Sequence, residues 1–219
     1  TGSLKQVASS DHERDRRDDR PSRSGFLWVV GSSHRGEEEI ILNAFQSLKA
    51  SFRDLRLVLA PRHPQRFSEV EKLLILRGVS FEKKSQMNGG VTFHKDLLLL
   101  DTIGDLENFY AIGDVAFVGG SLVDAGGHNL LEPARWHKPL LFGPYTSNVT
   151  PVANALKQQG GGFEVHCAED LVRELTVLLE EPCKRKIAGE NAYQIAVSDR
   201  SALEPSLAIV ARYVAAVNS

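Results

Sequence analysis

The chain has 219 residues, enough for one large domain or two small ones and for a substantial hydrophobic core. Its 26 Lys and Arg residues nearly balance 28 Asp and Glu residues, and the net charge of -2 argues against a protein that binds nucleic acid through bulk charge. No apolar run approaches the roughly 20 residues that cross a bilayer, and the first residues lack the apolar segment of a secretory signal. Two cysteines alone cannot build a disulfide framework or a zinc site. We therefore expect a soluble chain in a reducing, cytosolic compartment.

The amino-terminal 25 residues differ in composition from the rest of the chain. The stretch 11–23 consists almost entirely of Asp, Glu, Arg, His and Ser and shows no apolar periodicity. We expect residues 1–25 to be a linker or partly disordered segment and residues 26–219 to form the folded domain. Because charges of both signs alternate along this stretch, an arm for nucleic acid is the less favoured interpretation.

Beyond this segment, patterns typical of strands and helices alternate about six times. Short apolar runs predict buried strands at 26–30, 55–60, 97–100, 115–118 and 139–142, with another beginning at 79–81. Helical spacing of apolar residues predicts helices at 37–52, 67–77, 106–112, 151–158, 169–179, 183–197 and 203–217. This alternation predicts an α/β fold, with a doubly wound, mainly parallel sheet and helices on both faces. Ligands of such sheets bind beyond the carboxyl ends of the strands.

Several common sequence signatures are absent. The chain has no GxGxxG, GxxxxGK[ST], HExxH, GxSxG or CxxC motif. Dinucleotide-binding, P-loop and common hydrolase or metalloprotease templates are therefore unsupported. The candidate residues lie instead in four loops, each of which follows a predicted strand.

The segment 119–148 holds the densest group of candidate residues. It contains two glycine pairs, Gly119–Gly120 and Gly126–Gly127. His128 and Asn129 then open a predicted short helix. Glycines let the backbone approach a ligand closely, and a helix start offers unpaired N–H groups to an anion such as phosphate. Glu132, one turn later, can accept hydrogen bonds from two ribose hydroxyls. Alternatively, Asn129 and Glu132 form a capping-box-like pair that only starts the helix.

Two further loops carry candidate nucleotide contacts. In APRHPQRF, Arg62 is placed to donate bidentate hydrogen bonds to a phosphate, although the two prolines also fit a rigid, exposed turn. In DTIGDL, Gly104 allows the backbone to contact a flat base. The alternative for this second loop is that Asp101 or Thr102 caps a helix.

The loop after the first predicted strand, at 31–39, combines small hydroxyl residues, a histidine and three glutamates. Ser32, Ser33 and His34 can line a substrate, while the glutamates complement the dipole of the following helix, which is a structural role. A Ser–His nucleophile pair is disfavoured because no third orienting residue is visible. We expect all four loops to converge on one edge of the sheet.

Four stretches of the sequence resemble one enzyme family. FVGGSLVDAGGHNLLEPARWHKPLLFGPYTSN, APRHPQRF, DTIGDLENFYAIGD and SSHRGEEE resemble the signatures of 3-deoxy-D-manno-octulosonic acid (Kdo) transferases, in the family's order. The opening TGSLK resembles the segment that begins the second domain of that family. The resemblance covers the chain from about residue 1 to residue 217.

The resemblance implies one half of a GT-B glycosyltransferase, an enzyme in which two Rossmann-like domains enclose a cleft. Such enzymes transfer Kdo from CMP-Kdo to a lipid A precursor in lipopolysaccharide biosynthesis. They invert the anomeric carbon, need no metal or other cofactor, and bind CMP in their carboxyl-terminal half. By this resemblance, the expected nucleotide contacts are Pro61, Arg62, Ile103, Gly104, Asp105, Asn129, Leu130, Leu131 and Glu132, with Glu132 on the ribose and the amides near Asn129 on the phosphate. The expected contacts on the donor side are Ser32, His34, Gly127 and His128.

The resemblance also implies a partner half that this chain lacks. In the family, the general base is a Glu of the amino-terminal half, which also carries the membrane anchor and the acceptor-binding face. We therefore expect this chain to bind nucleotide without catalysing transfer, and the full protein to act at the cytoplasmic side of the inner membrane. The sequence departs from the family pattern at Arg35, where an acidic residue is usual, and in the charged segment 11–23.

Two other functional classes remain as alternatives. A GT-B enzyme that uses a UDP-sugar, or a UDP-sugar epimerase, would prefer uridine nucleotides to cytidine nucleotides. A non-catalytic module, in which the four loops only cap helices, would bind no nucleotide.

Overall fold

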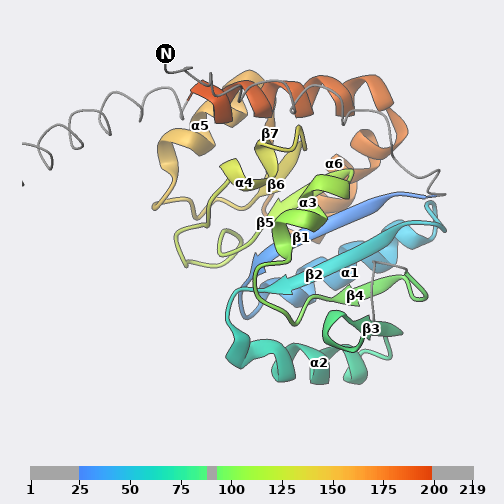
Figure 1. Ribbon diagram of the computed structural model, residues 1–219. Helices are drawn as coiled ribbons and strands as arrows, with labels where there is room; N and C mark the ends of the chain where they lie inside the picture. The colour runs from blue at the N-terminus through green and yellow to red at the C-terminus, as the bar shows by residue number, and fades with distance from the viewer. Residues whose placement is uncertain (1–24, 88–92, 199–219) are drawn as a thin grey trace, which may run out of the picture.

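The computed structural model describes residues 25–87 and 93–198, and seven strands in this part of the chain form one parallel sheet (Figure 1). The expected fold class is confirmed, while the segment 1–24 and the helix expected at 203–217 lie outside the described residues. The strands are β1 (Leu27–Ser33), β2 (Arg56–Pro61), β3 (Phe81–Lys83), β4 (Leu97–Leu99), β5 (Val115–Val118), β6 (Leu140–Phe142) and β7 (Gly162–Glu164). They lie side by side in the order β3-β4-β2-β1-β5-β6-β7.

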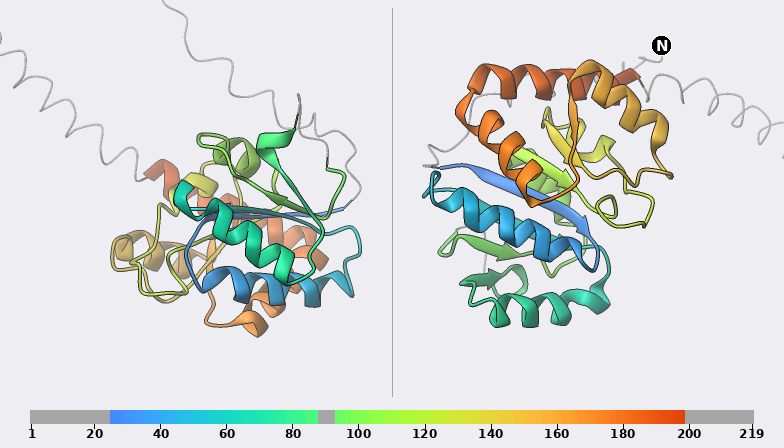
Figure 2. Two further views of the ribbon diagram at one scale, coloured as in Figure 1. Left: turned by 90° about the horizontal axis from the view of Figure 1, so that it is seen from below. Right: turned by 180° about the vertical axis from the view of Figure 1, so that it is seen from behind.

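Helices cover both faces of this sheet. One face carries α1 (Glu37–Lys49), α2 (Phe67–Leu76) and α6 (Ala168–Glu180), which are in front in the right view of Figure 2. The other face carries α3 (Leu106–Ile112), α4 (Leu131–Ala134) and α5 (Thr150–Gln159). A further helix over 182–198 contributes apolar side chains to both layers, and two short 3-10 turns are η1 (Pro64–Arg66) and η2 (Lys84–Gln86).

The central strand explains why the core has two layers. In β1, Leu27 and Val29 belong to one layer and Trp28 and Val30 to the other, and all four side chains are fully buried. Successive side chains of a strand alternate between the faces of the sheet. A strand that is covered on both faces therefore needs an unbroken apolar run, which is the pattern this sequence shows.

The two edge strands were predicted less well than the centre of the sheet. β3 begins at Phe81 rather than at Val79, and its three side chains are only half-buried. β7 was missed, because its sequence GFE holds one large apolar residue and follows two glycines. Edge strands are covered incompletely, so their sequences carry a weaker apolar signal.

The strand order of the sheet changes direction between the neighbouring strands β1 and β5. From β1 it moves outward to β2, and after β4 it returns to β5 on the other side of β1. Doubly wound sheets bind ligands in the crevice beyond the carboxyl ends of two such strands. The loops after β1 and β5 are therefore the first place to look for a site.

Candidate functional site

The exits of β1 and β5 lie in close backbone contact. The N–H of Gly119 donates to the carbonyl oxygen of Gly31 at 2.8 Å. A Cβ on Gly119 would lie 2.4 Å from the carbonyl oxygen of Ser32, so a larger residue does not fit there. Ser32 has a φ of 57°, a strained value for a residue with a side chain, at the point where the register of β1 shifts. Strain of this kind persists only where the surrounding structure holds it.

A buried carboxylate supplies that support. Glu37, which is 0% exposed, accepts hydrogen bonds from the N–H groups of Gly120 at 2.8 Å, Ser121 at 3.0 Å and Leu122 at 2.8 Å. It also accepts one from the N–H of His34 at 2.8 Å. These four bonds match the acceptor capacity of one carboxylate. Glu37 therefore joins the loop after β1 to the loop after β5.

This arrangement changes the interpretation of two sequence features. The glutamates lie in the first turn of α1, as a role in complementing the helix dipole requires, and Glu37 and Glu38 are in addition buried and bonded to neighbouring loops. We also expected the glycine-rich backbone after β5 to approach an anion, whereas the N–H groups of Gly120, Ser121 and Leu122 already face Glu37. Sequence reasoning missed this role, and the only sequence signal was a run of three glutamates at a helix start.

Glu38 orients the loop after β2 in a similar way. Its carboxylate accepts two hydrogen bonds from the Arg66 guanidinium, at 2.7 and 3.2 Å, and one from the Ser33 hydroxyl at 2.8 Å. The Arg62 N–H donates to the carbonyl oxygen of Ser33 at 3.0 Å. The loop that carries Arg62 and His63 is thus fixed to the exit of β1. Arg35, the departure from the family pattern, instead pairs with Glu69 at the surface.

Three histidines from three loops meet beside these exits. The Nε2 atoms of His34 and His128 are 2.7 Å apart, and their ring planes lie within 22° of parallel with centroids 5.0 Å apart. The His63 ring meets the His34 ring edge-on, with centroids 5.6 Å apart. Burial lowers the pKa of His34, and it lowers the pKa of His128 to about 4, where the charges of His34, Arg62 and His63 add to the effect.

The positive charge of Arg62 also affects the pKa of Glu132 in α4. Burial raises the pKa of the Glu132 carboxyl, and the positive charge of Arg62 opposes this shift. The pKa of Tyr110 in α3 is raised first by its complete burial and then by the Glu132 charge. His34, Arg62, His128 and Glu132 were all predicted site residues, and the structure brings them together at one edge of the sheet.

The residues around Asn129, which are expected nucleotide contacts, also have a structural role. The Asn129 side-chain oxygen accepts a hydrogen bond from the Leu131 N–H at 3.0 Å, which orders the chain at the entry to α4. The cap position of α4 is Leu130, which has no side-chain cap, so the capping-box interpretation of Asn129 with Glu132 is not confirmed. The side chains of Leu130 and Leu131 are buried in the core, and the Gly127 N–H donates to the Gly120 carbonyl oxygen at 2.7 Å. Any contact that Leu130 or Leu131 makes with a ligand must therefore use the backbone.

The loop after β4 is more exposed to solvent than the loops after β1 and β5. Ile103 is 83% exposed, Gly104 has a φ of 91°, and the Thr102 hydroxyl donates to the Asp105 carboxylate at 2.5 Å. The alternative that Asp101 or Thr102 caps α3 was wrong, because Asp101 accepts hydrogen bonds from the N–H and hydroxyl of Ser85 instead. This loop meets the rest of the site through α3, whose Glu107 helps to raise the pKa of Glu132.

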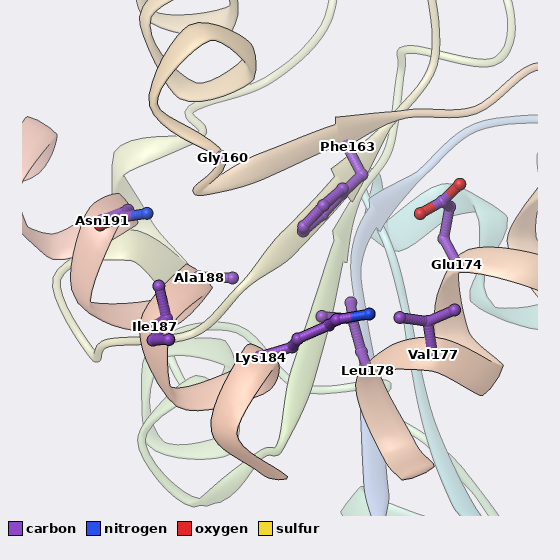
Figure 3. A pocket seen from close by; sticks show the side chains of 9 residues that line it. All are labelled: Gly160, Phe163, Glu174, Val177, Leu178, Lys184, Ile187, Ala188 and Asn191. Atoms are coloured by element: carbon purple, nitrogen blue, oxygen red, sulfur yellow. The ribbon is translucent and has the colours of Figure 1, made fainter. Parts of the chain in front are cut away.

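A cavity of about 280 Å³ lies elsewhere, between β7, α6 and the helix over 182–198 (Figure 3). Phe163, Val177, Leu178 and Ile187 supply much of its apolar lining, with the ammonium group of Lys184 beside them. None of the predicted site residues lines it. Its apolar lining does not suit an anionic nucleotide, so the cluster at the carboxyl edge remains the candidate site.

Within 25–87 and 93–198, no group of three or more His, Cys, Asp or Glu side chains is arranged to hold a metal ion. In the same part of the chain, no helix is both long and apolar enough to cross a membrane. Cys167 and Cys183 are free.

Comparisons with known proteins point to one group of enzymes. No protein-family model matches the chain. The chain is 42% identical to a 3-deoxy-D-manno-octulosonic acid transferase of Aquifex aeolicus over 160 residues, which are 71% of this chain and 42% of that protein. It is 36% identical to the enzyme of the same name from Haemophilus influenzae over 189 residues, 86% of this chain and 44% of that protein. The chain thus spans less than half the length of these relatives.

A solved structure agrees with these sequence matches. The C-terminal CMP-Kdo binding domain of WaaA from Acinetobacter baumannii superimposes with a TM-score of 0.72 and 29% sequence identity. The match covers 78% of this chain and 89% of that domain. The predicted resemblance to the carboxyl-terminal part of Kdo transferases is confirmed.

Proposed function

From this similarity to the carboxyl-terminal part of the Kdo transferases, we propose that the chain is the CMP-Kdo-binding half of an inverting GT-B glycosyltransferase. The observation that carries the proposal is the likeness to a CMP-Kdo binding domain over 89% of its length. The cluster of Arg62, His128 and Glu132 supports it, because these residues stand where a doubly wound sheet binds its ligand.

The proposed contacts follow the chemistry of CMP. Arg62 donates to the phosphate, and the backbone near Pro61 and Asn129 completes that side of the site. Glu132 accepts hydrogen bonds from the ribose hydroxyls, and the neighbouring Arg62 charge favours the ionised carboxylate that this requires. The backbone of Ile103, Gly104 and Asp105 receives the cytosine ring. Leu130 and Leu131 lie on the phosphate and ribose side, where they contribute backbone groups alone.

As CMP leaves, negative charge develops on its phosphate. Donors already held in place stabilise such charge without further reorganisation. The backbone of the Arg62 loop is fixed in advance, because the Arg62 N–H donates to the Ser33 carbonyl oxygen and the nearby Arg66 pairs with Glu38. Ser32 and Gly127 stand on the proposed sugar side of the donor, next to His34 and His128.

The activity of the whole protein is a further part of the proposal. We propose that a partner half, beyond the 219 residues of this chain, supplies the general base and the acceptor site for a lipid A precursor. Closure of the two halves would then exclude water and limit hydrolysis of the donor. On this proposal the described residues belong to the donor-binding domain, and the assembled enzyme acts at the cytoplasmic side of the inner membrane.

Calorimetric titration of the purified chain tests the proposal. We expect binding of CMP, with UMP and UDP bound more weakly, and no transfer of Kdo by the chain alone. A preference for UDP would move the chain to the alternative class of UDP-sugar enzymes. Absence of binding to all three nucleotides would contradict the donor-binding role, and detectable Kdo transfer by the isolated chain would contradict the assignment of the base to another half.

A further inference from the structure

The paired imidazoles of His34 and His128 are arranged to hold a defined number of protons. Their Nε2 atoms are 2.7 Å apart, a hydrogen-bond distance. One Nε2 must therefore carry a proton while the other presents its lone pair. Two neutral rings meet this condition, and so does a pair with one extra proton. A pair with both rings protonated does not, because two N–H groups would face each other.

The surroundings of the pair keep it neutral in the free chain. His63 and Arg66 place positive charge near His34, while Arg62 and His63 do so near His128. The carboxylates of Glu37 and Glu38 oppose this at His34, but both already accept hydrogen bonds from other groups. Burial is the largest cause of the lowered pKa at each ring, and it brings that of His128 to about 4.

An anion beside Arg62 would reverse this balance. It would offset the positive charge around His128 and offer a new hydrogen-bond acceptor. A protonated His128 could then donate through Nε2 to His34 and through Nδ1 to the anion, so that every group of the pair is satisfied. The extra proton comes from solvent, and no covalent bond changes.

We propose that His34 and His128 form a proton-linked binding site for the phosphoryl group of the nucleotide, taking up one proton as the ligand binds beside Arg62. The inference rests on the proposed nucleotide-binding function and adds to it a specific charge state. His128 is the ring that meets the phosphoryl group, and His34 is a positioning residue that acts through it.

The sign of the expected pH effect follows from proton linkage. The pair binds fewer protons in the free chain than in the complex, so affinity rises as the pH falls below the pKa of the complex. With one proton taken up, the dissociation constant falls by up to about tenfold for each pH unit. This dependence ends near pH 4, where the free chain also holds the proton on His128.

The probe must not titrate in the same range. Cytidine 5′-methyl phosphate is suitable, because its diester keeps a single negative charge between about pH 5 and pH 8. Calorimetry of the full 219-residue chain at about pH 6, in two buffers of different ionisation enthalpy, counts the protons taken up on binding. We expect about 0.5 to 1 proton per ligand, and none when cytidine, which lacks the phosphoryl group, is the ligand.

Single substitutions assign the proton to the pair. In His128→Asn and in His34→Asn, proton uptake and the pH dependence of affinity should disappear. The exposed His94, at the other end of the strands, provides the matched control His94→Asn, which should keep both.

The outcomes separate this inference from the function on which it rests. Binding of the diester without proton uptake would overturn the role of the pair and leave the nucleotide site in place. Uptake that persists in both His34→Asn and His128→Asn would assign the proton elsewhere and also overturn it. No binding of the diester or of CMP by the wild-type chain would contradict the proposed function, and the inference would fail with it.

Discussion

The two loops proposed to hold the ends of the nucleotide are built in different ways. The loop after β5 is bonded through three backbone N–H groups to the fully buried Glu37 carboxylate, which also holds the loop after β1. The loop after β4 has Ile103 83% exposed at its tip, and its Asp101 is bonded to Ser85. The phosphate side is therefore fixed before a ligand binds, whereas the base side is open. A fixed backbone suits the side of the site where charge develops during reaction, and an open loop suits a flat ring that needs little electrostatic help.

The largest effect should come from removing the carboxylate that fixes the phosphate side. Glu37→Ala would leave three buried N–H groups and one partly buried N–H group without their acceptor. We expect a loss of roughly 3–5 kcal/mol in the free energy of unfolding, measured by urea denaturation. Glu39→Ala, an exposed neighbour on the same helix, is the matched control and should change little. A loss below about 1 kcal/mol for Glu37→Ala would show that the two loops do not depend on this carboxylate.

A pair of glycine substitutions compares the two sides directly. In Gly119→Ala the new Cβ would lie 2.4 Å from a backbone oxygen, so we expect a loss of about 2 kcal/mol or more in the free energy of unfolding. In Gly104→Ala no atom lies within 4 Å of the new Cβ, and only the positive φ of 91° opposes the change. We expect about 1 kcal/mol there. Equal losses in the two variants would remove the distinction between the fixed side and the open side.

The ribose contact should affect binding rather than stability. Glu132→Ala removes the proposed acceptor for two ribose hydroxyls, and we expect CMP affinity to weaken by roughly 1–3 kcal/mol. The measurement is calorimetric titration of the folded variant with CMP. Unchanged affinity would rule out the ribose role of Glu132.

The histidine pair should make stability depend on pH. His128 has a pKa of about 4 in the folded chain against 6.5 for a free side chain, so the folded state binds fewer protons between these values. Stability is therefore lost as the pH falls below 6.5 towards 4. Allowing for partial exposure, we expect a loss of about 1 kcal/mol between pH 7 and pH 5 that is present in the wild type and absent in His128→Asn. Urea denaturation at both pH values measures it, and parallel pH profiles for the two proteins would contradict it.

The smallest effect is expected at the surface pair that marks the departure from the family pattern. Arg35 donates two hydrogen bonds to Glu69, at 2.9 and 2.8 Å, but its side chain is 80% exposed. Exposed ion pairs add little to stability, so Arg35→Ala should leave the urea midpoint unchanged within error. A clear drop would show that this pair, too, helps to fix the loop after β1.

The sequence predicts the centre of the fold better than its edges, for a physical reason. Central strands are buried on both faces, so β1 and β5 appear as unbroken apolar runs. The edge strand β7 has a short sequence with one large apolar residue, which no pattern separates from a loop. Gly78, at a φ of 63° just beyond α2, shows that a helix end with a glycine is also readable from sequence.

The site was predicted as a set of loops but not as a network. Sequence position relative to the strands was sufficient to bring His34, Arg62, His128 and Glu132 to one edge. It was not sufficient to show that Glu37 accepts hydrogen bonds from the glycine-rich backbone after β5, because these bonds join residues 83 to 85 positions apart. Periodicity carries no information about such pairings, and the same N–H groups could equally have met a phosphate.

The crystal structure of this chain with CMP bound would test the central claim most directly. We expect the phosphate beside Arg62 and His128, the ribose hydroxyls on Glu132, and the base against the backbone at Gly104. CMP bound instead in the apolar cavity between β7, α6 and the helix over 182–198 would contradict the claim that the carboxyl edge of the sheet is the donor site.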